Sequence, residues 1–199
     1  MSRSAQIKRT TGETEITVDL DLDGSGRSEI DTGVGFLDHL LSALTRHGRL
    51  DLTLTCRGDL EIDDHHTVED CGLALGAAIS EALGERRGIA RFGSAYAPLD
   101  EALARAVVDV SGRGGAYVDL ALQRESIGAL STENIPHFVD SLARNAGLTI
   151  HLDVLKGAND HHRAEAAFKA LALALRQALA VTGTDDVPST KGVIEGGPS

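Results

Sequence analysis

The sequence predicts an α+β fold of two similar halves, in which helices pack between two sheets. The strongest sign of a duplication is the run DHHTVE at residues 64–69, which returns as DHHRAE at residues 160–165. Outside these motifs, a shift of ninety-eight residues also aligns the halves, for example Leu50 with Leu148. Each half has segments of alternating polarity as well as stretches in which apolar residues recur at helical spacing. Such a repeated order of strands and helices favours sheets covered by helices.

The first half opens with residues 14–22, where apolar and polar residues alternate as in a half-buried strand. Leucines and a phenylalanine at helical spacing then predict a helix over residues 35–47, which Gly48 ends. Residues 50–54 alternate again and predict a second strand. A longer helix follows, carries the first motif and ends near Gly84.

The second half repeats this order. Residues 106–110 and 116–122 alternate, and the glycine-rich segment 111–115 between them predicts a hairpin turn. The remaining elements are a helix over residues 135–146, a strand over 148–152 and the second motif helix over 160–181. Each half is therefore a strand-helix-strand-helix unit with an antiparallel or mixed sheet. The motif helices are rich in alanine and glycine, which suits close packing between helices.

We expect one compact domain with three segments: a first half-repeat over residues 1–90, a second over 91–183, and a C-terminal tail over 184–199. The tail has no periodicity. It contains the run PSTKG at residues 188–192, whose two hydroxyl groups and one cation are suited to close over an anion.

The composition limits the possible partners. The formal net charge is -11, so we expect no nucleic-acid partner, because phosphate backbones are bound by basic surfaces. Charged residues interrupt the most apolar helical stretch, so we expect no membrane span. Two cysteines, Cys56 and Cys71, are too few for a disulfide framework and favour a cytoplasmic protein.

Eight histidine and glutamate side chains are candidate metal ligands: His39, His65, His66, Glu69, His137, His161, His162 and Glu165. All offer nitrogen or oxygen and none is a thiolate, so the set suits manganese, iron, cobalt or zinc. On a helix, the first His and the Glu of each motif lie four residues apart and share a face. The second His is rotated by about 100° and points elsewhere.

Two motif helices, packed together or against copies in other subunits, can therefore exchange their second histidines. This exchange predicts two metal ions, one held by His65, Glu69 and His162 and the other by His161, Glu165 and His66. His39 and His137 would each add a fourth ligand, and the sequence does not assign which ion each one joins.

Two further groups of residues are candidates for supporting roles. Carboxylates near the motifs could orient imidazoles, with helix capping an equal alternative for the two that open the helices: Asp63, Asp64, Asp70 and Asp160. Basic residues near glycines or loops are candidates to bind an anion: Arg91, Arg113, Lys169 and Lys191.

Several segments, in order along the chain, closely resemble the imidazoleglycerol-phosphate dehydratases. They are RTTGET at residues 9–14, GFLDH at 35–39, DHHTVED at 64–70, NAGLT at 145–149, HHRAEAAFK at 161–169 and PSTKG at 188–192. The resemblance covers essentially the whole chain. We expect the single-function form, without a fused phosphatase-like domain.

The resemblance implies a carbon-oxygen lyase of L-histidine biosynthesis that dehydrates D-erythro-imidazoleglycerol 3-phosphate to imidazoleacetol phosphate. It also implies a ribosomal S5 domain 2-like fold with two four-stranded sheets, two Mn²⁺ ions per active site, and a homo-oligomer of 24 subunits with sites between them. The eight candidate ligands would hold the metals. The substrate would contact six residues, the last five at its phosphate end: Glu13, Arg91, Arg113, Lys169, Ser189 and Lys191.

The chemistry of this reaction suggests a route. The hydrogen to be lost lies on a carbon that is not acidic, so the imidazole ring, bound between two metals as imidazolate, would store electron density. The hydroxyl beside the ring then leaves to give a diazafulvene-like intermediate, and loss of the neighbouring proton gives an enol that becomes the ketone. The candidate catalytic residues are Glu13, Glu69 and Glu165. Proton transfer would fall to Glu13 or Glu165, and the sequence does not choose between them.

Two other classes of protein use similar ligands. A binuclear metallohydrolase would need bridging carboxylates and an activated water, and only two glutamates serve eight candidate ligand positions here. A non-catalytic metal-dependent assembly or storage protein would more often use carboxylate-rich sites.

Overall fold

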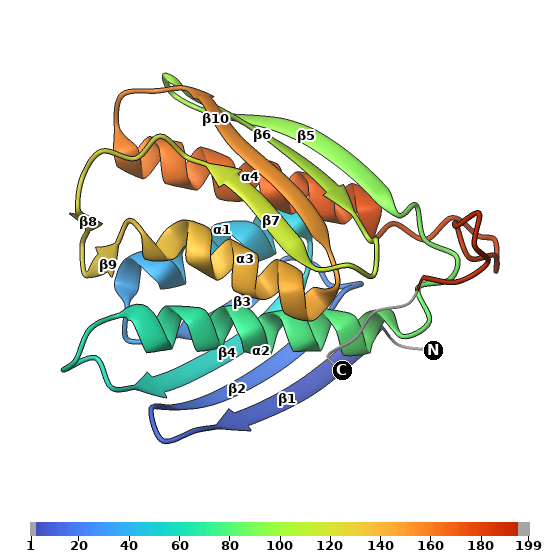
Figure 1. Ribbon diagram of the computed structural model, residues 1–199, viewed down its shortest axis with the longest axis horizontal. Helices are drawn as coiled ribbons and strands as arrows, with labels where there is room; N and C mark the ends of the chain where they lie inside the picture. Colours follow the sequence, from blue (N-terminus) through green and yellow to red (C-terminus); the bar gives the residue numbers. More distant parts are fainter. Residues whose placement is uncertain (1–2, 195–199) are drawn as a thin grey trace.

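The structure, a computed structural model, describes residues 3–194 and has two four-stranded sheets that enclose a layer of four helices (Figure 1). The first sheet contains β1 (Ser4–Thr10), β2 (Thr14–Asp21), β3 (Ser28–Asp31) and β4 (Asp51–Gly58). The second contains β5 (Phe92–Leu99), β6 (Ala102–Asp109), β7 (Gly115–Asp119) and β10 (Thr149–Lys156). The helices are α1 (Gly35–Gly48), α2 (His65–Leu83), α3 (Asn134–Ala146) and α4 (Asp160–Ala178). A small hairpin precedes α3 and consists of β8 (Ser126–Ile127) and β9 (Leu130–Ser131).

Both sheets have the same strand order. It is β1-β2-β4-β3 in the first sheet and β5-β6-β10-β7 in the second. In each sheet one pair is parallel, β3 with β4 and β7 with β10, and the remaining pairs are antiparallel. The predicted α+β fold, with helices between two mixed sheets, is therefore confirmed. The division into half-repeats at residue 90 stays a prediction, and residues 195–199 of the expected tail lie outside the described residues.

The predicted hairpin over residues 106–122 is wrong. β6 and β7 lie in the same sheet, but β10 lies between them, antiparallel to β6 and parallel to β7. The glycine-rich connection crosses the beginning of β10, where the N–H of Gly112 donates to Gly147 O and the N–H of Gly115 donates to Leu148 O. A glycine-rich connection has the same appearance in sequence whether it joins neighbouring strands or strands one place further apart.

Besides the short β8 and β9, the sequence patterns miss three strands of the two large sheets, β1, β3 and β5, which all lie at sheet edges. Of these, β1 buries only Ala5 fully, and β3 has four residues of which none is fully buried. In β5 the inward positions hold glycine or alanine, whereas Phe92 and Tyr96 face outward. The alternation of polarity that predicts a half-buried strand is therefore weak or inverted in all three.

The core lies between the two sheets and is built mainly from aliphatic side chains. The inward face of β2, for example, is formed by Ile16, Val18 and Leu20, all of which are at most 2% exposed. Two aromatic rings of the helix layer also belong to this core, Phe138 of α3 and Phe168 of α4, and their centroids lie 6.0 Å apart.

Within residues 3–194, no helix is both long and apolar enough to cross a membrane.

Among the helices, each motif helix packs against one from the other half, α2 against α3 and α4 against α1, and α4 also packs against β5 and β6. Glycines permit the close approach of the first pair. A Cβ atom at Gly72 would lie 2.8 Å from Phe138 O, and one at Gly76 would lie 2.5 Å from Leu142 O. Close packing of a motif helix is thus confirmed for α2, and these two helix pairs connect the two halves of the molecule.

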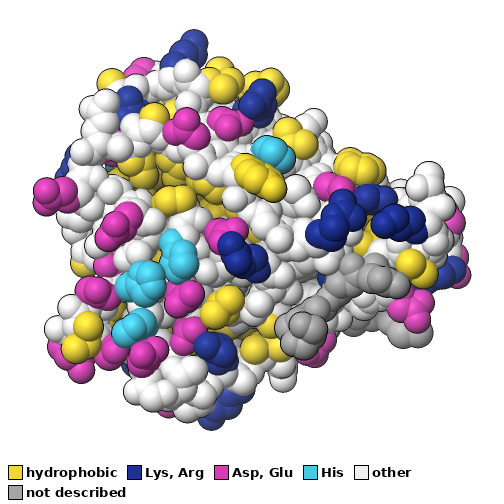
Figure 2. Space-filling model, viewed as in Figure 1, with side chains coloured by type: hydrophobic (Ala, Val, Ile, Leu, Met, Phe, Trp, Pro, Cys, Tyr) yellow, Lys and Arg dark blue, Asp and Glu magenta, His cyan; other side chains and the backbone are white. Residues whose placement is uncertain are grey.

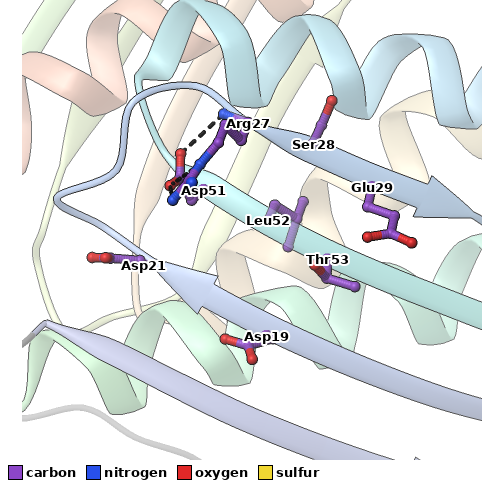
Figure 3. A pocket seen from close by; sticks show the side chains of 8 residues that line it. All are labelled: Asp19, Asp21, Arg27, Ser28, Glu29, Asp51, Leu52 and Thr53. Atoms are coloured by element: carbon purple, nitrogen blue, oxygen red, sulfur yellow. Dashed lines mark hydrogen bonds and ion pairs between the residues drawn. The ribbon is translucent and has the colours of Figure 1, made fainter.

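A hollow of about 420 Å³ lies over β2, β3 and β4, with several carboxylates along it (Figure 3). Its Asp51 accepts hydrogen bonds from the backbone N–H groups of Ser25, Gly26 and Arg27, and it forms an ion pair with the Arg27 side chain at 2.5 Å. Asp51 therefore fixes the shape of the loop between β2 and β3. None of the eight candidate metal ligands lines this hollow.

Candidate metal centres and anion pocket

The first cluster of candidate ligands joins α1 to the beginning of α4. The Nε2 atoms of His39 and His161 lie 2.8 and 3.2 Å from Oε2 of Glu165. His161 and Glu165 share one face of α4, as the spacing of four residues predicts. One carboxylate oxygen therefore has two imidazole nitrogens beside it.

The second cluster has the same composition and joins α2 to α3. Nε2 of His137 lies 3.3 Å from Oε1 of Glu69, and Nε2 of His65 lies 3.9 Å from Oε2 of Glu69. The rings of His65 and His137 stack with their centroids 4.9 Å apart. On its other side, Nδ1 of His65 lies 3.2 Å from Oδ1 of Asn134. Both clusters therefore combine residues from the two halves of the chain.

The residues of both clusters fit a divalent metal ion. In each cluster the three ligand atoms lie within 4.8 Å of one another. Nε2 of His137 is buried and makes no hydrogen bond to any described residue. Although Glu69 is nearby, a buried nitrogen without a hydrogen bond is costly, and a metal ion would satisfy it. Imidazole nitrogens with one carboxylate suit manganese, iron, cobalt or zinc better than calcium or magnesium.

The second histidines, His66 and His162, lie outside these clusters. Nε2 of His66 is 3.6 Å from Oε1 of Glu13, and its Nδ1 is 3.0 Å from Oδ2 of Asp59. Nδ1 of His162 is 2.8 Å from Oε2 of Glu101. An exchange of second histidines within one chain is therefore not seen, and the exchange between subunits stays a prediction. The structure does assign the third histidines, since His39 joins Glu165 and His137 joins Glu69.

Lys169 lies one helical turn after Glu165, and its Nζ is 2.7 Å from Oε1 of Glu165. Burial raises the pKa of Glu165, but the hydrogen bonds from Lys169 and His39 outweigh burial and lower the pKa to about 2. Glu165 is thus held as a carboxylate. Lys169, which the resemblance places at the substrate phosphate, therefore lies beside the first cluster of the single chain.

The acceptors that face the imidazoles are residues that the sequence patterns did not indicate, namely Asp59, Glu101 and Asn134. The four aspartates expected in that role have other partners. Asp63 accepts from the N–H of His65, Asp64 from Ser131, Asp70 from Arg9 and Thr14, and Asp160 from Gln123, Arg124 and Arg163. Capping by Asp64 and Asp160 is also wrong, because Asn159 caps α4 and the Asp64 side chain makes no cap hydrogen bond.

A second, separate pocket of about 300 Å³ collects four of the five residues expected at a phosphate. It is lined by Arg91, Ser111, Arg113, Ser189, Thr190, Lys191, Val193 and Ile194. The C-terminal segment is tied to this pocket, because Arg91 donates to Pro188 O at 2.7 Å and also pairs with Asp109. Three cations and two hydroxyl-bearing tail residues make the pocket suitable for an anion.

The clusters and the pocket lie at opposite ends of the molecule. Histidines and carboxylates gather at one side of Figure 2, whereas a group of Lys and Arg side chains lies near the C-terminal segment. Helix α4 begins at the first cluster and ends at Ala178, whose carbonyl accepts from the N–H of Arg91. From His161 to Ala178 the helix is about 25 Å long, at roughly 1.5 Å per residue. One chain cannot bring both ends to one small molecule.

Comparison with known proteins identifies the family. The family model for imidazoleglycerol-phosphate dehydratase matches residues 32–175. The imidazoleglycerol-phosphate dehydratase of Candida glabrata is 58% identical, over 96% of this chain and 99% of that protein. The crystal structure of the Staphylococcus aureus imidazoleglycerol-phosphate dehydratase has a TM-score of 0.81 and 38% identity, over 90% of this chain and 99% of that one. The Pyrococcus furiosus structure has a TM-score of 0.80 and 40% identity, over 94% and 99%. The chain therefore belongs to the imidazoleglycerol-phosphate dehydratase family and is a lyase.

Proposed function

We propose that this enzyme dehydrates D-erythro-imidazoleglycerol 3-phosphate to imidazoleacetol phosphate in L-histidine biosynthesis. The observation that carries the proposal is the pairing of two kinds of site in one chain. Two imidazole-rich metal-binding clusters suit a ligand with a ring nitrogen, and the pocket of Arg91, Arg113 and Lys191 suits a phosphate. The buried free thiols of Cys56 and Cys71 favour a cytoplasmic location.

Two Mn²⁺ ions per active site, when bound, would supply Lewis acidity to the substrate imidazole. Six histidines and two glutamates would hold them: His39, His65, His66, His137, His161, His162, Glu69 and Glu165. Clusters of three ligands leave room for a second histidine from elsewhere and for substrate. Loss of the hydroxyl beside the ring would then give a diazafulvene-like intermediate, as the chemistry of the reaction suggests.

Glu13 is the residue that we propose for proton transfer. Its side chain is 54% exposed, and its Oε1 stands 3.6 Å from Nε2 of His66. The alternative, Glu165, already contacts Lys169, His39 and His161. Although burial raises the pKa of Glu165, the hydrogen bonds from Lys169 and His39 lower it to about 2, which makes Glu165 a weak base. We therefore assign the proton transfer to the exposed carboxylate of Glu13. Glu69 takes the corresponding ligand position in the second cluster.

The active site is proposed to form between subunits of a homo-oligomer, which we expect to contain 24 copies. The two ends of the substrate, ring and phosphate, are separated by three carbons and thus by roughly 8 Å at most. The first cluster and the pocket of one chain are separated by the length of α4. A neighbouring copy must therefore supply the pocket, if a cluster and a pocket bind one substrate.

Turnover of imidazoleglycerol phosphate by metal-stripped protein, with and without added Mn²⁺, tests the function. We expect product only when Mn²⁺ is present. No product with any divalent metal, in a correctly assembled sample, would contradict the dehydratase proposal. Hydrolysis of phosphate esters by the same sample would favour the metallohydrolase, and metal-dependent assembly without either reaction would favour an assembly or storage protein.

A further inference from the structure

The second histidine of each motif has a carboxylate beside its Nδ1 atom. Nδ1 of His66 lies 3.2 and 3.0 Å from the two carboxylate oxygens of Asp59. Nδ1 of His162 lies 2.8 Å from Oε2 of Glu101. In the two clusters, all four histidines also direct Nε2 at their glutamate. In all six candidate histidine ligands, Nε2 thus faces a carboxylate at 2.8 to 3.9 Å, which for His66 is Glu13 and for His162 is Asp100.

A carboxylate can only accept hydrogen bonds, so the Nδ1 atom beside it must carry the proton. In a neutral imidazole the lone pair is then on Nε2. The hydrogen bond at one ring nitrogen thus decides which nitrogen can bind a metal. We propose that Asp59 and Glu101 are positioning residues that set the tautomer and the ring orientation of His66 and His162, so that Nε2 of each is available to a metal ion. This inference rests on the proposed function, because it assumes that both histidines are ligands.

The two carboxylates come from different places in the fold. Asp59 follows β4, and its side chain reaches His66 from the loop before α2. The connection between β10 and α4 is shorter and holds Gly157, Ala158 and Asn159, none of which is a carboxylate. Glu101 takes over the role from the turn between β5 and β6. Each half therefore places a carboxylate beside Nδ1 of its second histidine, but from a different position in the fold. This agreement in spite of different positions favours a functional role for the carboxylate.

Glu101 is fixed in place by the backbone. Its Oε1 accepts from the N–H groups of Ala158 and Asn159 at 3.0 and 2.9 Å, and its Oε2 faces His162. The backbone N–H of Asn159, the His162 imidazole and the N–H of Ala158 lower the pKa of Glu101 to about 2. In the first half the matching turn, between β1 and β2, carries Glu13. Because Asp59 holds His66 there, Glu13 is free for the proton transfer proposed above.

The arrangement makes two substitutions differ in a testable way. In Glu101→Gln, the amide oxygen keeps the two backbone hydrogen bonds, and the amide NH₂ then faces Nδ1 of His162. Since an NH₂ group donates, Nδ1 must accept, and the proton moves to Nε2. In Asp59→Asn, both oxygens already face Nδ1, so the amide oxygen can take over and the tautomer is retained.

The experiment compares Glu101→Gln, Asp59→Asn and Asp59→Ala with the wild type and a matched control. Glu61→Gln is the control, because Glu61 is exposed on the same loop as Asp59. Solid-state NMR of metal-stripped protein with ¹⁵N-labelled histidine shows which ring nitrogen carries the proton. The signals of His66 and His162 are assigned from their loss in His66→Gln and His162→Gln.

Competition with a chelator measures the affinity for Mn²⁺. We expect Glu101→Gln to move the His162 proton to Nε2 and to weaken one Mn²⁺ site by about 10–100-fold. Asp59→Ala should weaken binding similarly, and Asp59→Asn by less.

Failure of this inference and failure of the proposed function are distinguishable. Wild-type signals that place the proton of His66 and His162 on Nε2 would overturn the inference whether or not the enzyme is active. Mn²⁺ binding by Glu101→Gln and Asp59→Ala as tight as that by Glu61→Gln would overturn it as well. A wild type without dehydratase activity, but with the expected tautomers and metal affinities, would instead contradict the function and leave the positioning role of the two carboxylates in place.

Discussion

At the scale of single residues, the turn that carries Glu13 is held from beneath by a buried carboxylate. Thr11 Oγ1 accepts from the N–H groups of Glu13 and Thr14. Thr14 Oγ1 donates to Asp70 at 2.5 Å, and Arg9 pairs with the same carboxylate at 2.8 Å. Asp70 follows Glu69 on α2, so the helix that carries candidate metal ligands also fixes the turn. An exposed Glu13 can therefore have a defined position.

Glu13→Gln tests the role of this carboxylate. The amide keeps the size of the side chain but accepts a proton far more weakly, so we expect turnover to fall by about 100-fold or more. Metal content and assembly should stay normal, since Glu13 is not among the candidate ligands. Steady-state rates and metal analysis of the same preparation give both answers. Near-normal turnover would remove Glu13 as the proton-transfer residue.

Asp51 offers a prediction that concerns stability instead of catalysis. Hydrogen bonds from the Arg27 side chain and from backbone N–H groups hold the pKa of Asp51 well below its ordinary value of 3.8. Its contribution to stability is therefore complete above that value and is lost as the pH falls towards the lower pKa of the folded state. Asp51→Asn should lower the melting temperature near neutral pH and reduce its fall in acid. Thermal melts from pH 7 to about pH 3 check this, and equal slopes for the two proteins would contradict it.

At the scale of helices and strands, close packing of α2 on α3 makes its glycines sensitive to substitution. A Cβ at Gly76 would come within 2.5 Å of the Leu142 carbonyl oxygen, which is backbone and cannot rotate away. Alanine favours a helix over glycine by about 1 kcal/mol, but overpacking costs roughly 1–3 kcal/mol or more. Gly76→Ala should therefore be destabilised in chemical unfolding. Gly35→Ala is the control, because a Cβ there meets no atom within 4 Å.

The elements differ in how well the sequence predicts them. Helical spacing in α1 and the motif helices is local and strong, so their positions follow from the chain alone. Strand partners are not local, and alternation says which face of a strand is buried but not which strand lies beside it. For this reason the pattern predicts β6, β7 and β10 as strands but does not place β10 between the other two.

The same limit applies to the site. The spacing of four residues predicts that His65 and Glu69 share a face, and the structure has them so. That His137 completes this cluster from the other half depends on how α2 packs against α3, which no local pattern contains. Asp59 and Glu101 are missed for the same reason, because each reaches its imidazole from a loop or turn outside the motif.

At the scale of the whole molecule, the position of each site along the helices decides how copies must cooperate. The clusters and Glu13 lie where α2 and α4 begin, and the pocket of Arg113 and Lys191 lies near the other end of α4. A substrate that needs both must therefore be bound by two chains or more. The exposed aromatic side chains Tyr96 and Tyr117, on the outer face of the second sheet, are at least 59% exposed in the single chain and are suited to a contact between copies.

Mixed assemblies test this directly, because two inactive variants should repair each other. Glu13→Gln removes proton transfer, and the double variant Arg113→Ala with Lys191→Ala removes the phosphate pocket, so each alone should have little activity. If the two functions come from different chains, equal mixing during reassembly leaves about a quarter of the sites with both functions intact. Activity should then rise well above the sum of the two parents. Mixing without metal removal and reassembly is the control and should give only that sum. If the reassembled mixture also gives only the sum, Glu13 and the pocket act within one chain. That result would contradict the inference that the length of α4 keeps the two sites of one chain too far apart for one substrate.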